Sequence, residues 1–199
     1  LVSRKTENLI LDIRGNEGGL DIGDAIISRI ASADVLLTKT KRYVRYQKIP
    51  SDLKPYLDTW DRSFDDWGKA ASDPKDGLYT LTRFDDMVTG NVIRPSGKRY
   101  AGRVFVLIGA TNSSATFQFA RTINANRLGT LIGQPTGGNQ RGITGGAFYF
   151  LRLPNTGIEI DLPLIGQYAI GDAPDAGIEP DVFVKPKADD IASGTDAEL

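Results

Sequence analysis

The sequence predicts an α/β fold made of repeated strand–turn–helix units, with a helical insertion and a strand-rich C-terminal part. Two apolar runs, residues 8–13 and 103–109, are each followed by a turn and then by apolar residues at helical spacing. The 199 residues are 40% hydrophobic and 25% charged, a balance that indicates one globular domain with a sizeable core.

The first unit begins with residues 8–13, a short apolar run bounded by polar residues, which is typical of a buried strand. A glycine-rich turn follows at residues 15–19. Residues 21–33 then predict a helix, with Asp21 placed to cap its first turn. The residues on its apolar face are Ile22, Ala25, Ile26, Ile30 and Ala33.

The middle of the chain predicts an insertion and a long loop over approximately residues 47–100. Residues 35–46 alternate like a strand, and residues 53–71 then carry large apolar side chains at helical spacing, which predicts a packed helix. These side chains are Leu53, Leu57, Trp60, Phe64 and Trp67. Residues 72–99 are polar and interrupted by proline and glycine, so we expect an irregular connection there.

The second unit consists of an apolar strand at residues 103–109 and a helix from about residue 114 to 126. A further buried strand is expected at residues 130–133, followed by a loop at 134–139. The C-terminal part predicts strands at 147–153, 157–162 and 182–184, with a turn at 154–157.

Ser114 falls at the start of the second helix, where unpaired backbone N–H groups and the helix dipole would stabilise an oxyanion. Taken alone, it also fits an ordinary helix cap. The chain contains no histidine and no cysteine. Because a serine hydroxyl needs a base to become a nucleophile, a lysine, a carboxylate or a group outside this chain would have to supply one.

Composition excludes several other classes of function. The 24 basic and 25 acidic residues are balanced and form no basic patch, so we expect no nucleic-acid partner. The absence of cysteine and histidine excludes disulfides and thiolate zinc sites, and we expect no metal. The chain has neither a dinucleotide fingerprint nor a phosphate-binding loop, so no cofactor is expected. No apolar run approaches the roughly 20 residues that span a bilayer.

Five short motifs follow one another along the chain. They are Leu11-Asp12-Ile13-Arg14-Gly15-Asn16-Glu17-Gly18-Gly19, Ser113-Ser114-Ala115-Thr116-Phe117, Gly133-Gln134-Pro135-Thr136-Gly137-Gly138 and Gly177-Ile178-Glu179-Pro180-Asp181, with Leu153-Pro154-Asn155-Thr156-Gly157 between the last two. Their order resembles the carboxy-terminal processing, or tail-specific, peptidase family, whose relatives include the tricorn protease core and interphotoreceptor retinoid-binding protein. The resemblance implies a ClpP/crotonase-like core and a serine-type endopeptidase that acts on a peptide or protein substrate.

The resemblance also implies roles for individual residues. Counting back from the Pro-Thr-x-Gly motif places the nucleophile on Ser114, with Ser113 as the alternative. The oxyanion hole would be formed by the backbone N–H groups of Ala115 and of Gly18 or Gly19. A carboxylate near Gly177, Asp175 or Asp172, is a candidate to orient a catalytic histidine, and both residues also fit solvated surface acids in turns.

The chain departs from the family pattern at two positions. Asn139 stands where members with a Ser–Lys dyad carry lysine, and Phe117 replaces the acidic residue that often follows the nucleophile. Members without that lysine, such as tricorn, take a histidine from an upstream part of the chain. We therefore expect residues 1–199 to be the C-terminal share of the peptidase domain, with an upstream part as its partner and the source of the base. Family members are exported to the periplasm, envelope or exterior, and the oligomeric state stays open.

Two other functions are compatible with the same scaffold. Relatives such as the retinoid-binding protein bind apolar ligands without peptidase chemistry, so a non-catalytic ligand- or peptide-binding module is one alternative. The second is a crotonase-like acyl-thioester enzyme, which also uses paired backbone N–H groups as an oxyanion hole.

Overall fold

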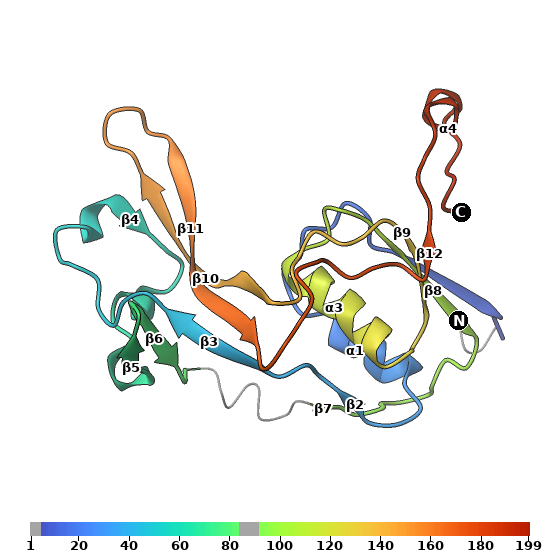
Figure 1. Ribbon diagram of the computed structural model, residues 1–199, viewed down its shortest axis with the longest axis horizontal. Helices are drawn as coiled ribbons and strands as arrows, with labels where there is room; N and C mark the ends of the chain where they lie inside the picture. The colour runs from blue at the N-terminus through green and yellow to red at the C-terminus, as the bar shows by residue number, and fades with distance from the viewer. Residues whose placement is uncertain (1–4, 84–91) are drawn as a thin grey trace. The chain divides into compact units, whose positions relative to one another are not determined.

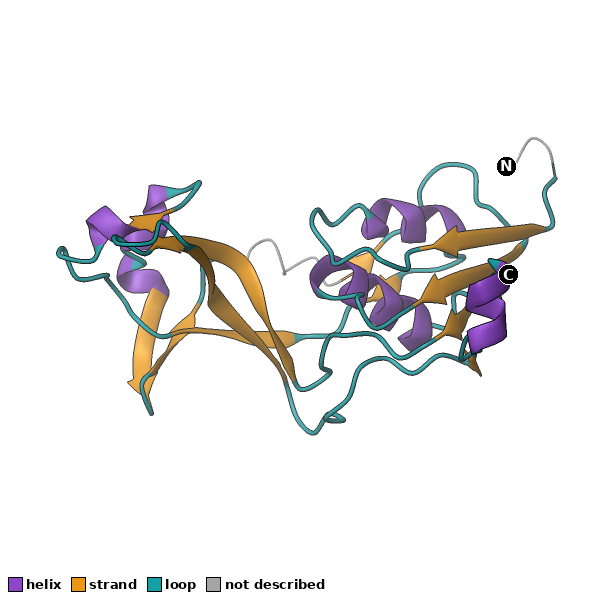
Figure 2. Ribbon diagram, turned by 90° about the horizontal axis from the view of Figure 1, so that it is seen from above, coloured by secondary structure: helices purple, strands orange, loops and turns teal. Residues whose placement is uncertain are grey.

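A computed structural model describes residues 5–83 and 92–199, and these residues form two compact units (Figure 1). Unit 1 comprises Leu1–Thr38, Asn91–Gln140 and Ala173–Leu199, and unit 2 comprises Lys39–Gly90 and Arg141–Asp172. Helices and strands alternate in unit 1, whereas unit 2 consists mainly of strands (Figure 2). The fold is therefore mixed α/β, as the sequence predicts.

Unit 1 is built around a four-stranded sheet in the order β1-β8-β9-β12. Its strands and their helices are β1 (Asn8–Asp12), α1 (Gly23–Ile30), β8 (Arg103–Ile108), α3 (Ser114–Ala125), β9 (Thr130–Gly133) and β12 (Val182–Phe183). Every pairing in this sheet is parallel. The two predicted strand–turn–helix units, β1 with α1 and β8 with α3, are thereby confirmed.

The core of unit 1 lies on both sides of β8. Strand β8 pairs with β1 through Leu9 opposite Val104, and with β9 through Val106 opposite Leu131. Buried side chains of β8, α3 and β9 lie there, and the largest that are fully buried are Val106, Leu107, Ile108, Phe117, Ile123 and Leu131. Because parallel strands end at the same edge of a sheet, the loops that follow β1, β8 and β9 are brought together, at the edge where open α/β sheets bind ligands.

Two smaller features complete unit 1. Strand β2 (Val35–Leu36) pairs antiparallel with β7 (Val92–Ile93). A short helix, α4 (Ala188–Ser193), follows β12. No helix in the described ranges is both long and apolar enough to cross a membrane.

Unit 2 contains a six-stranded antiparallel sheet in the order β4-β10-β11-β3-β6-β5. The strands are β3 (Thr40–Val44), β4 (Leu57–Asp58), β5 (Ala71–Lys75), β6 (Leu78–Leu81), β10 (Gly142–Arg152) and β11 (Glu159–Ala169). Its core joins this sheet to the segment between β3 and β5, and includes Val44, Ile49, Leu57, Phe64, Trp67, Leu81, Tyr149 and Ile165.

The predicted helix over residues 53–71 is wrong. The segment forms β4 and three short 3₁₀ turns, η2 (Lys54–Tyr56), η3 (Arg62–Asp65) and η4 (Gly68–Ala70). Aspartates explain the difference, since Asp61 accepts a hydrogen bond from Ser63 N and Asp66 accepts one from Gly68 N. Such local bonds compete with a continuous helix. Of the large apolar side chains, Leu57, Phe64 and Trp67 are buried in the core of unit 2, whereas Leu53 and Trp60 are exposed.

Three smaller expectations also need correction. Helix α1 begins at Gly23 with Ile22 in the cap position and no side-chain cap, so Asp21 does not cap it. Within the expected irregular connection at 72–99, β5 and β6 pair as an antiparallel hairpin, and residues 84–91 of this region lie outside the described ranges. Strands β10 and β11 are longer than predicted because they pair with each other along their length, from Gly142 opposite Tyr168 to Arg152 opposite Glu159.

Candidate active site

Ser114 occupies the first position of α3 with a backbone φ of 47°, in the left-handed region. This conformation is uncommon for a residue with a side chain and costs about 1–3 kcal/mol where it is imposed. The residue is exposed, and within the described ranges its hydroxyl makes no hydrogen bond. The turn from β8 into α3 therefore presents the hydroxyl to solvent.

The glycine-rich turn after β1 lies directly against this serine. Gly18 has a φ of 120°, and a methyl group placed on it would lie 2.7 Å from Ser114 Cβ and 3.0 Å from Ala115 N. Those separations leave no room for any side chain at position 18. Ser114, the Ala115 amide and the Gly18 backbone are consequently neighbours.

Hydrogen bonds fix the shape of the glycine-rich turn. Asn16 Oδ1 accepts from Gly18 N at 2.9 Å, so Asn16 braces the turn as its residue type suggests. Ser113 Oγ donates to Glu17 O at 2.6 Å, and Thr116 Oγ1 donates to Asn16 O at 2.8 Å. The first turn of α3 thus holds the backbone of the glycine-rich turn on two sides.

The two glycines differ in what their N–H groups do. Gly18 N–H is taken by Asn16 Oδ1, whereas no described group accepts a hydrogen bond from Gly19 N–H. The Ala115 N–H in the first turn of α3 likewise has no acceptor among the described residues. Gly19 has a φ of 125° and open space where a side chain would stand.

Asn112 connects three of the loops and is completely buried. Its side-chain Nδ2 donates to Ile13 O and Asn16 O, and its Oδ1 accepts from Gly109 N at 2.8 Å. Its backbone carbonyl also accepts from Gly137 N at 2.9 Å and from Gly138 N at 3.3 Å. None of the sequence motifs assigns a role to Asn112, although a polar residue between an apolar strand and a helix start is a signal for one.

The loop after β9 packs under the start of α3. Gly138 approaches the ring of Phe117 so closely that a methyl group on this glycine would overlap the ring. Phe117 itself is fully buried. The side chain at the position of the family's acidic residue is therefore a core side chain.

Asp175 lies beside the loop that carries Asn139. Asn139 Nδ2 donates to Asp175 Oδ1 at 2.7 Å. The two segments are further joined because Gln140 N donates to Ala176 O at 2.9 Å, and Thr136 Oγ1 accepts from Ile178 N at 2.8 Å. Asp172, the other candidate carboxylate, is exposed and belongs to unit 2.

Arg14 joins the β1 loop to the C-terminal segment. Its guanidinium pairs with Asp12 at 2.7 Å, with Asp196 at 2.8 Å and with the buried carboxylate of Glu198. Hydrogen bonds from Arg14 lower the pKa of Asp12 and the pKa of Asp196 below their ordinary values. Arg14 braces the structure through charge pairs, and its side chain reaches the chain's last residues, a contact that sequence spacing does not indicate.

Among the described residues no group of three or more acidic side chains is arranged to hold a metal ion. At the sheet edge, the exposed hydroxyl of Ser114 lies beside the backbone N–H of Ala115. This arrangement suits attack on a carbonyl carbon and stabilisation of the resulting oxyanion.

The model of peptidase family S41 matches residues 1–184 of the chain. The chain belongs to peptidase family S41. Solved structures agree in fold with this S41 chain. A candidate peptidase from Parabacteroides merdae is 21% identical and superposes with a TM-score of 0.54, and mature CPAF is 18% identical with a TM-score of 0.57. No curated protein sequence matches the chain.

These structures are considerably longer than the S41 chain described here. The superposition with the Parabacteroides merdae protein includes 98% of the chain described here but only 50% of the Parabacteroides merdae protein. The corresponding values for mature CPAF are 96% and 41%. The chain thus spans half or less of the length of these two proteins.

Proposed function

We propose that this chain carries the nucleophile and the oxyanion site of a serine peptidase that cleaves peptide or protein substrates. The observation that carries the proposal is the contact of Gly18 with Ser114 Cβ and Ala115 N. It supports the proposal because an exposed hydroxyl, without a hydrogen-bond partner among the described residues, lies next to backbone N–H groups from two different loops. The parallel sheet with two strand–turn–helix units supports a core of the ClpP/crotonase-like kind.

In this reaction Ser114 Oγ attacks the carbonyl carbon of the scissile peptide bond. The oxygen of that carbonyl becomes negative and accepts hydrogen bonds from Ala115 N–H and Gly19 N–H. We prefer Gly19 to Gly18 as the second donor because Gly18 N–H already donates to Asn16 Oδ1. The amine leaves with a proton, and water then attacks the acyl group on Ser114 and releases the second product.

A base from outside this chain takes the proton of Ser114 in our proposal. Asn139 at the position of the family's dyad lysine has an amide, which cannot act as a base, so the chain fits the branch without that lysine. We assign the base to an upstream histidine and its orientation to Asp175. The bond from Asn139 Nδ2 would hold the Asp175 carboxylate in place for that purpose.

The test uses the protein with its upstream part, a fluorophosphonate that labels activated serines, and a peptide-cleavage assay. Ser114→Ala should abolish both labelling and cleavage. Ser113→Ala is the matched control, because Ser113 Oγ donates to Glu17 O and so holds the turn without facing the substrate. That variant should still be labelled and should lose about tenfold or less in turnover, comparable to weakening one support of the oxyanion hole.

The opposite pattern, with labelling lost in Ser113→Ala and retained in Ser114→Ala, would transfer the nucleophile to Ser113. Absence of labelling and cleavage in the unmodified full-length protein would discard the peptidase assignment and favour a binding module.

A further inference from the structure

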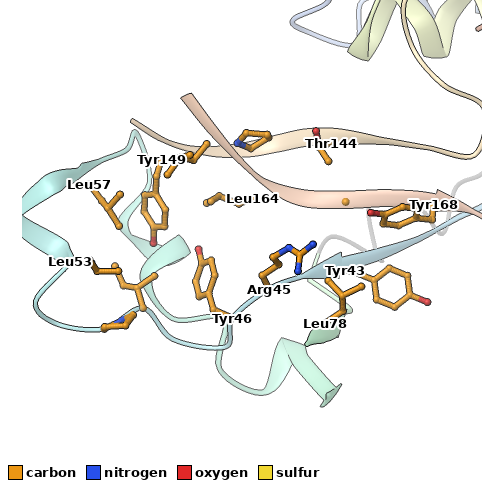
Figure 3. Close-up of a pocket in the computed structure, with 15 residues that line it drawn as sticks. Tyr43, Arg45, Tyr46, Leu53, Leu57, Leu78, Thr144, Tyr149, Leu164 and Tyr168 are labelled. Carbon is orange, nitrogen blue, oxygen red and sulfur yellow. The ribbon is translucent and has the colours of Figure 1, made fainter. Parts of the chain in front are cut away.

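Unit 2 holds a cavity of about 440 Å³ that the proposed peptidase chemistry does not use (Figure 3). It is bounded by β3, β6, β10 and β11 and by the chain between Tyr46 and Leu57. Sites for small molecules have volumes of roughly 300–1,000 Å³, are mostly apolar and carry a few polar groups. The cavity meets each of these conditions.

Most of the cavity wall is aliphatic. Leu162 and Leu164 alternate along β11 and therefore face the same side of the sheet. Leu53 and Leu57 line it from the connecting segment, and Leu53 is 46% exposed. Such a surface favours an apolar occupant, because covering it removes apolar area from water.

Two tyrosines add aromatic surface and have their hydroxyl groups occupied. The rings of Tyr46 and Tyr149 stack with centroids 6.2 Å apart. Tyr46 Oη donates to Phe64 O at 2.8 Å, and Tyr149 Oη donates to Asp65 Oδ1 at 3.0 Å. Both rings are thus held in position. Tyr149 is buried, so the partly exposed ring of Tyr46 is the one that offers apolar surface to an occupant.

Arg45 is the cation of the cavity wall. It follows β3 directly and is exposed, and in Figure 3 its guanidinium points from β3 toward the cavity. No described residue forms an ion pair or a hydrogen bond with it. A guanidinium binds a carboxylate through two parallel hydrogen bonds. Thr144 on β10 adds an exposed hydroxyl to the same cavity.

We propose that this cavity binds an apolar molecule that carries one carboxylate. The apolar part lies against the leucines and the tyrosine rings, and the carboxylate pairs with Arg45. A free long-chain acid and the apolar C-terminal residue of a peptide both have this chemistry. The proposal is independent of Ser114, because every residue it uses belongs to unit 2.

The experiment is calorimetric titration of the whole chain with matched charged and neutral probes. Decanoate is compared with its methyl ester, and acetyl-Ala-Ala-Phe with a free carboxylate is compared with its amide. At least one of the two acids should bind about tenfold or more tightly than its neutral counterpart, which corresponds to about 1.4 kcal/mol from the two charge-assisted hydrogen bonds to Arg45. The acid that binds identifies the source of the ligand.

Arg45→Met should remove the preference for the acid, because it deletes the charge and keeps an unbranched side chain. Lys75→Met is the matched control, since Lys75 is an exposed cation on β5 of the same unit and does not line the cavity. Leu53 is a half-exposed wall position that tolerates a polar residue. Leu53→Asp should lower the affinity for the acid about tenfold or more.

Failure of both acids to bind would overturn the proposal, and so would an undiminished acid preference in Arg45→Met. Binding is measured directly, so neither result depends on whether Ser114 cleaves peptides.

Discussion

Gly18 and Ser114 are packed so closely that position 18 has no space for a side chain: a methyl group there would lie 2.7 Å from Ser114 Cβ. Both residues also have positive φ values, 120° for Gly18 and 47° for Ser114. Two loops that follow different strands thus meet backbone to backbone at the candidate active site.

The first prediction concerns Gly18→Ala in the full-length protein. The added methyl group would push the glycine-rich turn away from Ser114 and Ala115, so peptide cleavage should fall by about a hundredfold or more, the cost of losing one oxyanion donor. Steady-state cleavage of a peptide measures this loss. Gly15→Ala is the control, because Gly15 also has a positive φ but has open space around it. It should keep most of the activity, and an equal loss in both variants would refute the packing argument.

The second prediction concerns Asn112→Ala. This substitution leaves the N–H of Gly109 without its acceptor, whereas the carbonyls of Ile13 and Asn16 lose one donor and keep Asn16 N–H and Thr116 Oγ1. The free energy of unfolding should fall by about 1–3 kcal/mol, the cost of one unsatisfied buried group. Urea denaturation measures the change. Asn155→Ala, in an exposed turn of unit 2, should change the value by less than about 0.5 kcal/mol.

The third prediction concerns pH. Arg14 lowers the pKa of Asp12 and of Asp196 below the ordinary value of 3.8, so these carboxylates stabilise the fold above that value. The contribution is lost as the pH falls through the lowered folded-state pKa, below about pH 4. Arg14→Gln should therefore destabilise the chain more at pH 7 than at pH 2.5.

Urea denaturation at both pH values measures this difference for Arg14→Gln. The control is Arg152→Gln, which removes an exposed ion pair with Glu159. That variant should show little effect at either pH, as exposed pairs contribute about 0–1 kcal/mol. A pH-independent effect of Arg14→Gln would contradict the assigned role of the charge pairs.

The fourth prediction separates the two candidate carboxylates. Asp175→Asn removes the charge and keeps an oxygen that can accept from Asn139 Nδ2. If Asp175 orients the base, turnover of the full-length protein should fall by about tenfold or more while the unfolding midpoint stays unchanged. Asp172→Asn should leave both quantities unchanged. A larger loss in Asp172→Asn would reverse the assignment.

Sequence patterns were sufficient to place those strands and helices whose apolar residues form a continuous run or recur at helical spacing. The apolar runs of β1, β8 and β9 and the helical spacing after Ser114 placed these elements within one or two residues. The same reasoning failed for residues 53–71, where Leu57, Phe64 and Trp67 are buried in the core of unit 2 while Leu53 and Trp60 stay exposed. Aspartates bond locally in that segment and divide it into short turns.

By itself, the sequence determined the α/β class, the family resemblance and the choice of Ser114, since each depends on residues close together in the chain. Only the tertiary structure decided that Gly18 contacts Ser114, that Asn112 is buried between three loops, and that Asp175 bonds to Asn139. These partners are far apart in sequence, and parallel pairing of β1, β8 and β9 brings their loops to one edge of the sheet. Contacts of this kind depend on strand order and register, which no local pattern encodes.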